Sequence, residues 1–536
     1  MVKEVDLHAP LAGNELPAAT ASPLAVIDIG ATSMRMLVAQ ADGEGNLHEL
    51  EAMQQSVTLG KDTFTGGSIR QESIEECIAG LRNFLRILRE YGLDAASPRL
   101  RVVATSAVRE ALNQQAFLDR VFIATGFEVE VVDNAEVARF TYLGIRRFLD
   151  SRPFAQRDPV LLVEIGGGGT EVLCLTGRTV VFSQAHRLGS LRVRQGRAER
   201  QAAEVGWQAL VENQVWRMAE IMREQGASLQ RASLVAMGGD ARFAARQLDP
   251  DWNGQGLARL PLHAWRELTD EVVGTSPDEL VQRYHLTYPA AETLGPAMLA
   301  YALLAEQLGR KWMYVTGVSM RDGVLGEMVR PTIWEGDFTR QIIRSALTLA
   351  QRYQVDVPHA EHVAKVARKL FAFLREEHRL GARHELILTL AALLHEVGMF
   401  IGTTSHHKHS YYVIANSEIF GLGARSIELV AQVARYHRRA EPKPTHLPYN
   451  NLRRDERIAV CQLAAILRVA DAIERSHTQR VARLDLARQD GTLVITVHGM
   501  ADLSYEQMAL AEKGGLFEQV FGLRVVLAKA ISPGKP

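Results

Sequence analysis

Cysteines, long apolar segments and net charge are all scarce in this chain. Its 536 residues include three cysteines, Cys77, Cys174 and Cys461, which lie far apart and form no CxxC pair. This spacing argues against a disulfide framework or a zinc–thiolate site and is typical of a reducing cytoplasm, so we expect a cytoplasmic protein. No stretch approaches the roughly 20 apolar residues of a membrane span, and the amino-terminal residues lack the pattern of a signal peptide.

Neither sign of charge dominates the sequence. The chain has 61 Lys and Arg against 62 Asp and Glu, a formal net charge of −1. Such a balance gives no overall attraction to nucleic acid or to a membrane surface, and we predict neither as a partner. With 47% hydrophobic and 23% charged residues, the composition is that of an ordinary globular protein, and the length requires several domains.

Two apolar runs each end in an acid followed by a glycine turn. Residues 161–171 read LLVEIGGGGTE, and residues 24–33 read LAVIDIGATS. Glycines let the backbone approach a ligand closely, and successive amides in such a turn converge on an anion. Two turns facing each other would make a phosphate and metal cleft, although four glycines can also serve a tight structural turn. Residues 234–240, LVAMGGD, form a third candidate ligand loop.

The repeated turn resembles the actin-like ATPase superfamily, in which two ribonuclease H-like halves each offer a phosphate loop. With residues 102–113, VVATSAVREALN, and residues 394–398, LHEVG, the chain more narrowly resembles the exopolyphosphatase / guanosine pentaphosphate phosphohydrolase (Ppx/GppA) family. The resemblance runs from about Leu24 through nearly the whole chain. It implies an α/β fold of duplicated ribonuclease H-like halves, then an all-α HD-like domain and a small C-terminal α+β segment.

The sequence pattern divides the chain into five predicted parts. Two prolines and mixed charges mark a junction at residues 151–159, and residues 331–337 interrupt the pattern again. Helical periodicity dominates after that break, and a strand pattern returns at residues 492–497. The predicted parts are a flexible tail (1–23), a first ribonuclease H-like subdomain (24–150), a second (151–330), a helical HD-like domain (331–490) and a small C-terminal α+β domain (491–536).

The resemblance implies a phosphohydrolase that releases terminal orthophosphate from inorganic polyphosphate or guanosine pentaphosphate, and a homodimer. The reaction needs charge neutralisation, a positioned water and a base. We expect Mg²⁺ to be held by Asp28, Glu164 and Glu171, because Mg²⁺ prefers oxygen ligands. The expected phosphate ligands are the two loops and the arginine that matches the family's: Thr32, Ser33, Arg109, Gly166, Gly167, Gly168, Gly169 and Thr170.

The identity of the catalytic base stays open. The family typically has two acids before Ala-Arg and uses the second as base, but this chain reads Glu136-Val137-Ala138-Arg139. Glu136, Glu164 and Glu171 are the candidate catalytic residues, with weak hydrolysis as a further alternative. The first loop also reads Ala-Thr-Ser where the family usually has Ser-Asn-Ser. Both departures favour a second hypothesis, a module that binds polyphosphate or an alarmone without turnover.

The helical region contains a second candidate site. Metal-dependent HD-type phosphohydrolases have His-Asp where this chain has His395-Glu396, and imidazole with carboxylate suits Mn, Fe, Ni or Zn better than Mg. There are two alternatives for this region. It is either the catalytic site of a metal-dependent phosphohydrolase or a relic of one, in which the histidines are buried and hydrogen-bonded. Because glutamate replaces the aspartate, we expect little or no bound transition metal. The candidate ligands are His359, His395, Glu396, His409, His437 and Asp471.

Overall fold

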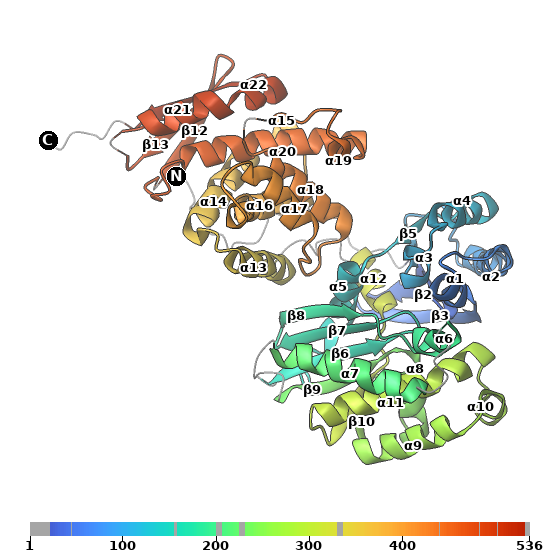
Figure 1. Cartoon of the computed structure of the whole chain (residues 1–536). Helices are drawn as coiled ribbons and strands as arrows, with labels where there is room; N and C mark the ends of the chain where they lie inside the picture. The colour runs from blue at the N-terminus through green and yellow to red at the C-terminus, as the bar shows by residue number, and fades with distance from the viewer. Residues whose placement is uncertain are drawn as a thin grey trace. The chain divides into compact units, whose positions relative to one another are not determined.

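The computed structural model describes residues 22–43, 45–154, 158–199, 206–224, 231–329, 336–438, 440–481, 483–500 and 502–530. They form two compact units that divide near residue 331. Two α/β halves make up the first unit, and a helical bundle with a small sheet makes up the second (Figure 1). Most of the predicted amino-terminal tail lies outside the described residues, as does the predicted boundary at 330–331.

The first half is built on a five-stranded sheet of order β3-β2-β1-β4-β5. β1 pairs antiparallel with β2 and parallel with β4, which is the arrangement of a ribonuclease H-like sheet. The sequence pattern had not indicated β3, an edge strand whose side chains are all exposed or only partly buried. The strands are β1 Leu24–Ile29, β2 Ser33–Ala41, β3 Leu47–Ser56, β4 Leu100–Ala104 and β5 Val129–Val131; the helices are α1 Leu59–Gly66, α2 Gln71–Glu90, α3 Ser106–Arg109, α4 Gln114–Thr125 and α5 Asn134–Ile145, followed by the 3₁₀ turn Arg146–Phe148.

Strand alternation decides what covers each face of this sheet. Ile27 and Ile29 of β1 pack into a core with α2 and α4. Val26 points to the opposite face, where it meets α5 and α12 (Met320–Val329), the last helix of the second half. Because side chains alternate along a strand, Asp28 lies on the face of Val26, at the end of β1. The last helix of the unit therefore closes the first sheet over the acid predicted to hold metal.

The second half repeats this topology and adds one strand. Its sheet has the order β10-β11-β9-β6-β7-β8, with β6 antiparallel to β7 and parallel to β9. β8-β7-β6-β9-β11 thus reproduces the order of the first sheet, which confirms the predicted duplication. The strands are β6 Pro159–Ile165, β7 Thr170–Thr176, β8 Thr179–His186, β9 Ser233–Met237, β10 Leu257–Pro261 and β11 Trp312–Thr316; the helices before α12 are α6 Ser190–Glu199, α7 Trp207–Glu224, α8 Gly238–Leu248, α9 Leu262–Gly274, α10 Pro277–Tyr284 and α11 Tyr288–Gln307.

The second unit is a bundle around α16, whose residues Leu386–Leu394 are all buried. Because it is apolar on every side, this helix must be central in the bundle, and it packs against α13, α14, α18 and α20. None of the helices in the described ranges is long and apolar enough to cross a membrane. The helices are α13 Asp337–Arg352, α14 Val357–Phe373, α15 Arg375–His378, α16 Ala382–Leu394, α17 His406–Ala415, α18 Ala424–Arg435, α19 Leu447–Asn450 and α20 Arg454–Ile473, with the 3₁₀ turn Val397–Phe400.

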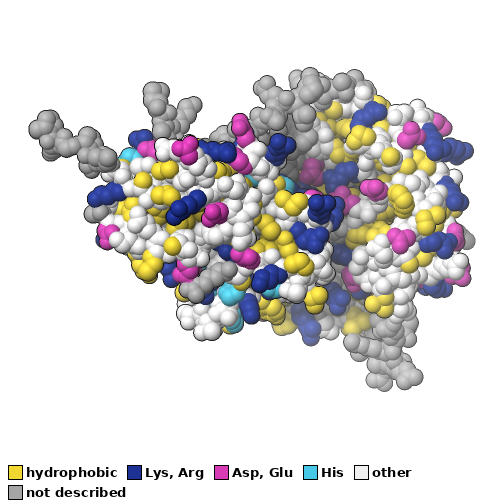
Figure 2. All heavy atoms as spheres, turned by 90° about the horizontal axis from the view of Figure 1, so that it is seen from above, with side chains coloured by type: hydrophobic (Ala, Val, Ile, Leu, Met, Phe, Trp, Pro, Cys, Tyr) yellow, Lys and Arg dark blue, Asp and Glu magenta, His cyan; other side chains and the backbone are white. Residues whose placement is uncertain are grey.

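A three-stranded sheet of order β12-β13-β14 follows the bundle. Its strands are β12 Arg483–Gln489, β13 Thr492–His498 and β14 Arg524–Lys529, and α21 (Ser504–Lys513) and α22 (Gly515–Phe521) lie between the last two. Both helices pack on α20. The sheet thus begins before the predicted boundary at residue 491. The sequence pattern did not indicate β12, because this strand is mostly exposed and shows little alternation of buried and exposed residues. On the face shown in Figure 2, basic and acidic side chains are interspersed.

Candidate functional site

Both halves of the first unit line a cleft of about 1910 Å³. The turn after β1, the four-glycine turn after β6 and the turn after β9 all open into it, so the cleft includes the third candidate loop. Of the predicted residues, the cleft lining includes Asp28, Thr32, Ser33, Arg109, Glu164, Gly166, Gly167, Gly168, Gly169 and Glu171.

The two predicted loops have the same internal geometry. Gly30 N donates to Ser33 O at 3.0 Å in the first, and Gly166 N donates to Gly169 O at 2.8 Å in the second. The residues that flank each turn are cross-strand partners. Asp28 faces Arg35 across β1 and β2, and Glu164 faces Glu171 across β6 and β7. The duplication therefore places an acid–arginine pair on one side of the cleft and an acid–acid pair on the other.

Close packing explains the glycines of the second loop. None of the four has a left-handed φ, but a Cβ at Gly168 would come within 2.2 Å of Ser106 Oγ, and one at Gly167 within 3.3 Å of Thr32 Cγ2. The loop carbonyls accept hydrogen bonds from the start of α6, with Ser190 N donating to Gly166 O at 3.0 Å. Among the turn and loop hydrogen bonds of the described chain, no backbone carbonyl accepts from the amides of Gly167 and Gly168, which suits the binding of an anion.

The Tyr301 hydroxyl couples the second and third loops. It donates to Met237 O at 2.6 Å and accepts from Ile165 N at 2.8 Å. The third loop also has a conformational need for glycine, because Gly238 has φ +91° and a Cβ there would lie 3.4 Å from Glu164 Cγ. These contacts fix the ends of β6 and β9 beside each other at the floor of the cleft.

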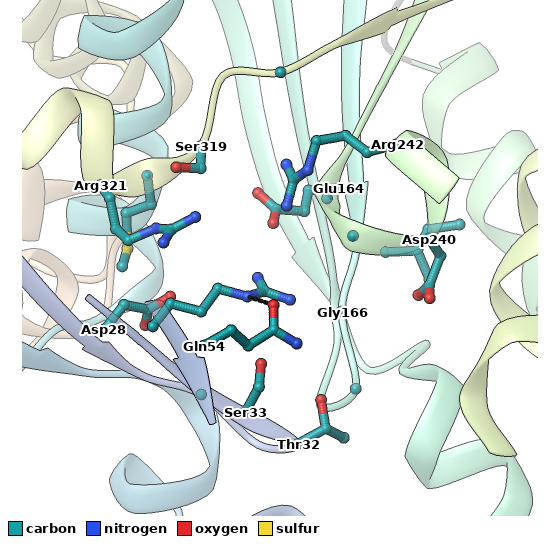
Figure 3. A pocket seen from close by; sticks show the side chains of 18 of the residues that line it. Asp28, Thr32, Ser33, Gln54, Glu164, Gly166, Asp240, Arg242, Ser319 and Arg321 are labelled. Carbon is teal, nitrogen blue, oxygen red and sulfur yellow. Dashed lines mark hydrogen bonds between the residues drawn. The ribbon is translucent and has the colours of Figure 1, made fainter. Parts of the chain in front are cut away.

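Three arginines that the sequence analysis did not single out extend into the cleft: Arg35, Arg242 and Arg321. In Figure 3, Arg242 and Arg321 extend toward each other from opposite sides. Arg35 Nε donates to Gln54 Oε1 at 3.1 Å. Among the described residues no hydrogen-bond partner reaches the buried Nη1 of Arg242 or the buried Nε of Arg321. Burial lowers the pKa of both, that of Arg242 to about 10, so Arg242 stays charged at neutral pH.

Carboxylates lie among these arginines. Burial raises the pKa of Asp28, against the attraction of Arg321 and Arg35, and also raises the pKa of Glu164, against Arg242 and Arg35. Asp240, in the first turn of α8, has its pKa raised by burial to about 7. Asp28 Oδ1 is buried without a hydrogen-bond partner in the described chain. Guanidinium and carboxylate groups thus lie side by side in the cleft, a combination that suits an anion together with a metal ion.

Arg109 lines the same cleft and is held rigidly. Its guanidinium donates to Val132 O at 2.7 Å and to Asn134 Oδ1 at 2.5 Å. The neighbouring Glu110 accepts from Arg192 Nη2 at 2.5 Å, and Arg192 also donates to Gly168 O at 2.5 Å. Glu110 belongs to the first half and Arg192 to the second. This contact therefore ties the four-glycine loop to the segment that carries Arg109.

Two predicted site residues lie elsewhere. Thr170 is fully buried and donates to Leu188 O at 2.6 Å, so its hydroxyl is not directed at a ligand. Glu136 caps α5: its carboxylate accepts from Asp133 N at 3.1 Å, and it is absent from the cleft lining. Val137, 8% exposed, lines the cleft in its place. Both differences from the prediction have the same cause, namely that neighbouring residues on a strand or helix point in different directions.

Among the candidate ligands of the helical unit, the structure brings together His359, His395 and Asp471. Glu396 instead groups with His359 and His477. His437 Nε2 faces His406 Nε2 at 3.2 Å, and His409 belongs to neither group. Burial lowers the pKa of His359 to about 4. Burial opposes ionisation of Asp471, but Lys513 outweighs it and keeps the pKa of this carboxyl below its usual value.

Two models of known protein families match this chain. A model described as the Ppx/GppA phosphatase family matches residues 37–331, and one described as Ppx/GppA phosphatase, domain III, matches residues 342–512.

Solved structures match the chain in fold. An exopolyphosphatase from Cytophaga hutchinsonii is 20% identical over 58% of this chain and 98% of its own, with a TM-score of 0.51. An exopolyphosphatase-like protein is also 20% identical, over 58% of this chain and 99% of its own, with a TM-score of 0.50. The Ppx/GppA family member of Aquifex aeolicus is 23% identical over 57% of this chain and 97% of its own, with a TM-score of 0.44. At these identities the likeness to the first two structures concerns the fold alone.

The different settings of two threonines give a paired prediction. Thr170→Val should lower the stability of the first unit by about 1–3 kcal/mol, because it leaves the buried Leu188 carbonyl without its donor. Thr32→Val should leave stability nearly unchanged and weaken binding of inorganic polyphosphate about tenfold or more, the worth of one hydrogen bond to a charged group. Calorimetric melting and titration of the full chain measure the two effects. A Thr170→Val protein of normal stability that lost polyphosphate affinity would reverse the assignment.

Proposed function

The chain belongs to the Ppx/GppA phosphatase family, and we propose that its cleft binds inorganic polyphosphate and releases terminal orthophosphate from it. Guanosine pentaphosphate, whose phosphates have the same chemistry, is the second substrate to test. The proposal includes slow turnover, because Val137 occupies the place of the family's base.

One observation carries this proposal: two arginines that line the cleft between the two glycine turns each bury one guanidinium nitrogen that has no hydrogen-bond partner in the described chain. A buried guanidinium that lacks a partner destabilises a fold unless a ligand compensates it. Arg242 Nη1 and Arg321 Nε, on opposite sides of the cleft, both have this property in the described chain. Phosphate suits a planar guanidinium, which can donate two hydrogen bonds to it. A chain of phosphates could contact both arginines together with the loop amides.

The acids fit a divalent ion beside the phosphates. Asp28 Oδ1 has no hydrogen-bond partner among the described residues, and Glu164 lines the cleft from the equivalent strand of the other half. Mg²⁺ takes oxygen ligands and usually only one or two carboxylates. Asp28 and Glu164 would hold it, and the ion would add positive charge on the phosphoryl oxygens.

The three candidate bases differ in their surroundings. Glu136 is engaged in capping α5 and does not line the cleft. Glu164 lies within the electrostatic influence of Arg242 and Arg35, and we assign it to Mg²⁺. Glu171 lines the cleft as the cross-strand partner of Glu164, and we assign water activation to it.

The direct test measures orthophosphate released from long-chain polyphosphate and from guanosine pentaphosphate, each with Mg²⁺ and with Mn²⁺. The proposal predicts slow, metal-dependent release that Glu171→Gln reduces. Tight binding without any release would favour the alternative of a non-catalytic polyphosphate or alarmone sensor, which Val137 already supports. Absence of both binding and release would contradict the two hypotheses together.

Arg242 should lower the stability of the ligand-free protein and strengthen the binding of polyphosphate. Arg242→Met removes a buried charge that lacks a partner on Nη1, so the ligand-free protein should melt at a higher temperature, while polyphosphate affinity should fall at least tenfold. Arg101→Met is the matched control, since Arg101 is paired with Glu130 at 2.6 Å and Glu327 at 2.7 Å. The control should lose stability. An Arg242→Met protein that binds normally would remove this arginine from the site.

Restoring a carboxylate at position 137 should raise turnover. Val137→Glu should increase the rate of orthophosphate release by at most the roughly 10²–10⁴-fold that a general base contributes, since Glu171 already activates water. Glu136→Gln is the control and should leave the rate near that of the wild type, because the wild-type carboxylate accepts from Asp133 N. Loss of a robust wild-type activity in Glu136→Gln would contradict the assignment of Glu136 to helix capping.

A further inference from the structure

A buried group of two histidines and one aspartate lies inside the helical unit. His359 is in the first turn of α14, His395 directly follows α16, and Asp471 is in the last turn of α20. Their exposed fractions are 0%, 0% and 3%. Asp471 Oδ1 lies 3.9 Å from His359 Nε2 and 3.8 Å from His395 Nε2. Three different helices therefore direct one potential ligand atom each to a common point.

Hydrogen bonding inside the protein leaves these nitrogens unused. His395 Nδ1 lies 2.7 Å from Ala392 O; since a carbonyl only accepts, Nδ1 carries the proton and Nε2 presents a lone pair. In the part of the chain described, neither His395 Nε2 nor either nitrogen of His359 has a hydrogen-bond partner. Leaving polar atoms buried and unpaired is costly. The arrangement of an anchored Nδ1 and an open Nε2 is common among metal-binding histidines.

The spacing also fits an ion. Ligand atoms at 2.0–2.1 Å from a tetrahedral metal lie roughly 3.4 Å from each other. The distances of 3.8 and 3.9 Å in this group are too long for hydrogen bonds. They need to shorten by only a few tenths of an ångström around a metal ion.

The other oxygen of Asp471 is already occupied. Lys513, at the end of α21, donates to Asp471 Oδ2, and Lys513 is itself buried. This contact balances the charge of the carboxylate and fixes its orientation while Oδ1 stays directed at the histidines. Partners of this kind orient ligands in known metal sites. The C-terminal segment therefore helps to shape a site whose ligands belong to the bundle.

The replacement of aspartate by glutamate at position 396 does not affect this group. Glu396 lies in the second group with His359 and His477, and the His477 ring stacks on His359 at 3.6 Å. The sequence-based reason to expect little bound metal assumed that Glu396 is a necessary ligand. The structure supplies three ligands without it.

We propose that His359 Nε2, His395 Nε2 and Asp471 Oδ1 bind one transition-metal ion. Two imidazoles with one carboxylate suit zinc, iron, manganese or nickel, whereas Mg²⁺ prefers oxygen ligands alone. Three protein ligands leave a coordination position for water, as in metal sites that do chemistry rather than closed structural ones. This site is separate from the phosphate cleft and does not depend on the function proposed for it.

The test is metal content of the full chain, purified without chelator, incubated with Zn²⁺ and desalted. Elemental analysis should find about one ion per chain in the wild type and near zero in His395→Ala and in Asp471→Asn. His409→Ala is the matched control and should keep its metal, because His409 lies in neither group. Wild-type protein without metal after loading overturns the proposal, and so does equal metal content in His395→Ala.

Two further measurements guard against variants that fold poorly. Wild-type protein loaded with Co²⁺ should show the visible absorption of a nitrogen- and oxygen-ligated site, which needs no mutation. Lys513→Met should bind metal about 10–100-fold more weakly, the usual effect of losing a group that orients a ligand, while His409→Ala should bind normally. If Co²⁺ gave only the spectrum of the hydrated ion, the proposal would fail. Tighter binding in Lys513→Met would show that the lysine competes with the metal and would overturn its positioning role.

Discussion

The cleft between the two α/β halves contains buried guanidinium nitrogens for which the described residues supply no hydrogen-bond acceptor. Arg242 and Arg321 each bury a guanidinium nitrogen that no described residue accepts from, and burial favours the neutral form of the nearby acids Asp28, Glu164 and Asp240. A fold tolerates such unpaired guanidinium nitrogens when a ligand of opposite charge binds to them. The loops, the coupling by Tyr301 and the closing helix α12 all position groups around these nitrogens.

Duplication gives the cleft its two-sided form, and divergence of the copies gives it asymmetry. The turns after β1 and β6 share one hydrogen bond and one cross-strand geometry. At the equivalent position, however, one half has Arg35 and the other Glu171. One side of the cleft can thus attract phosphate while the other offers a carboxylate to water.

The sequence predicted the duplicated sheets and the three loops, because an apolar strand followed by a glycine turn is a local pattern. It could not identify Arg35 as a cleft residue, since that depends on its pairing with Asp28 across two strands. Alternation could have excluded Thr170, which precedes the cleft-lining Glu171 on the same strand. The side chains of Glu396 and His395 belong to different groups of candidate ligands because the backbone turns after α16. The contact of Lys513 with Asp471 joins residues 42 positions apart. Neither is visible in a single sequence.

In the proposed function, both loops and the arginines form one polyanion site. A crystal structure of the full chain with inorganic polyphosphate tests it most directly. We expect consecutive phosphates between the turns Gly30–Ser33 and Gly166–Gly169, with oxygens within hydrogen-bond distance of Arg242 and Arg321. Phosphate bound only outside the cleft, with both guanidinium groups still unpartnered, would contradict it.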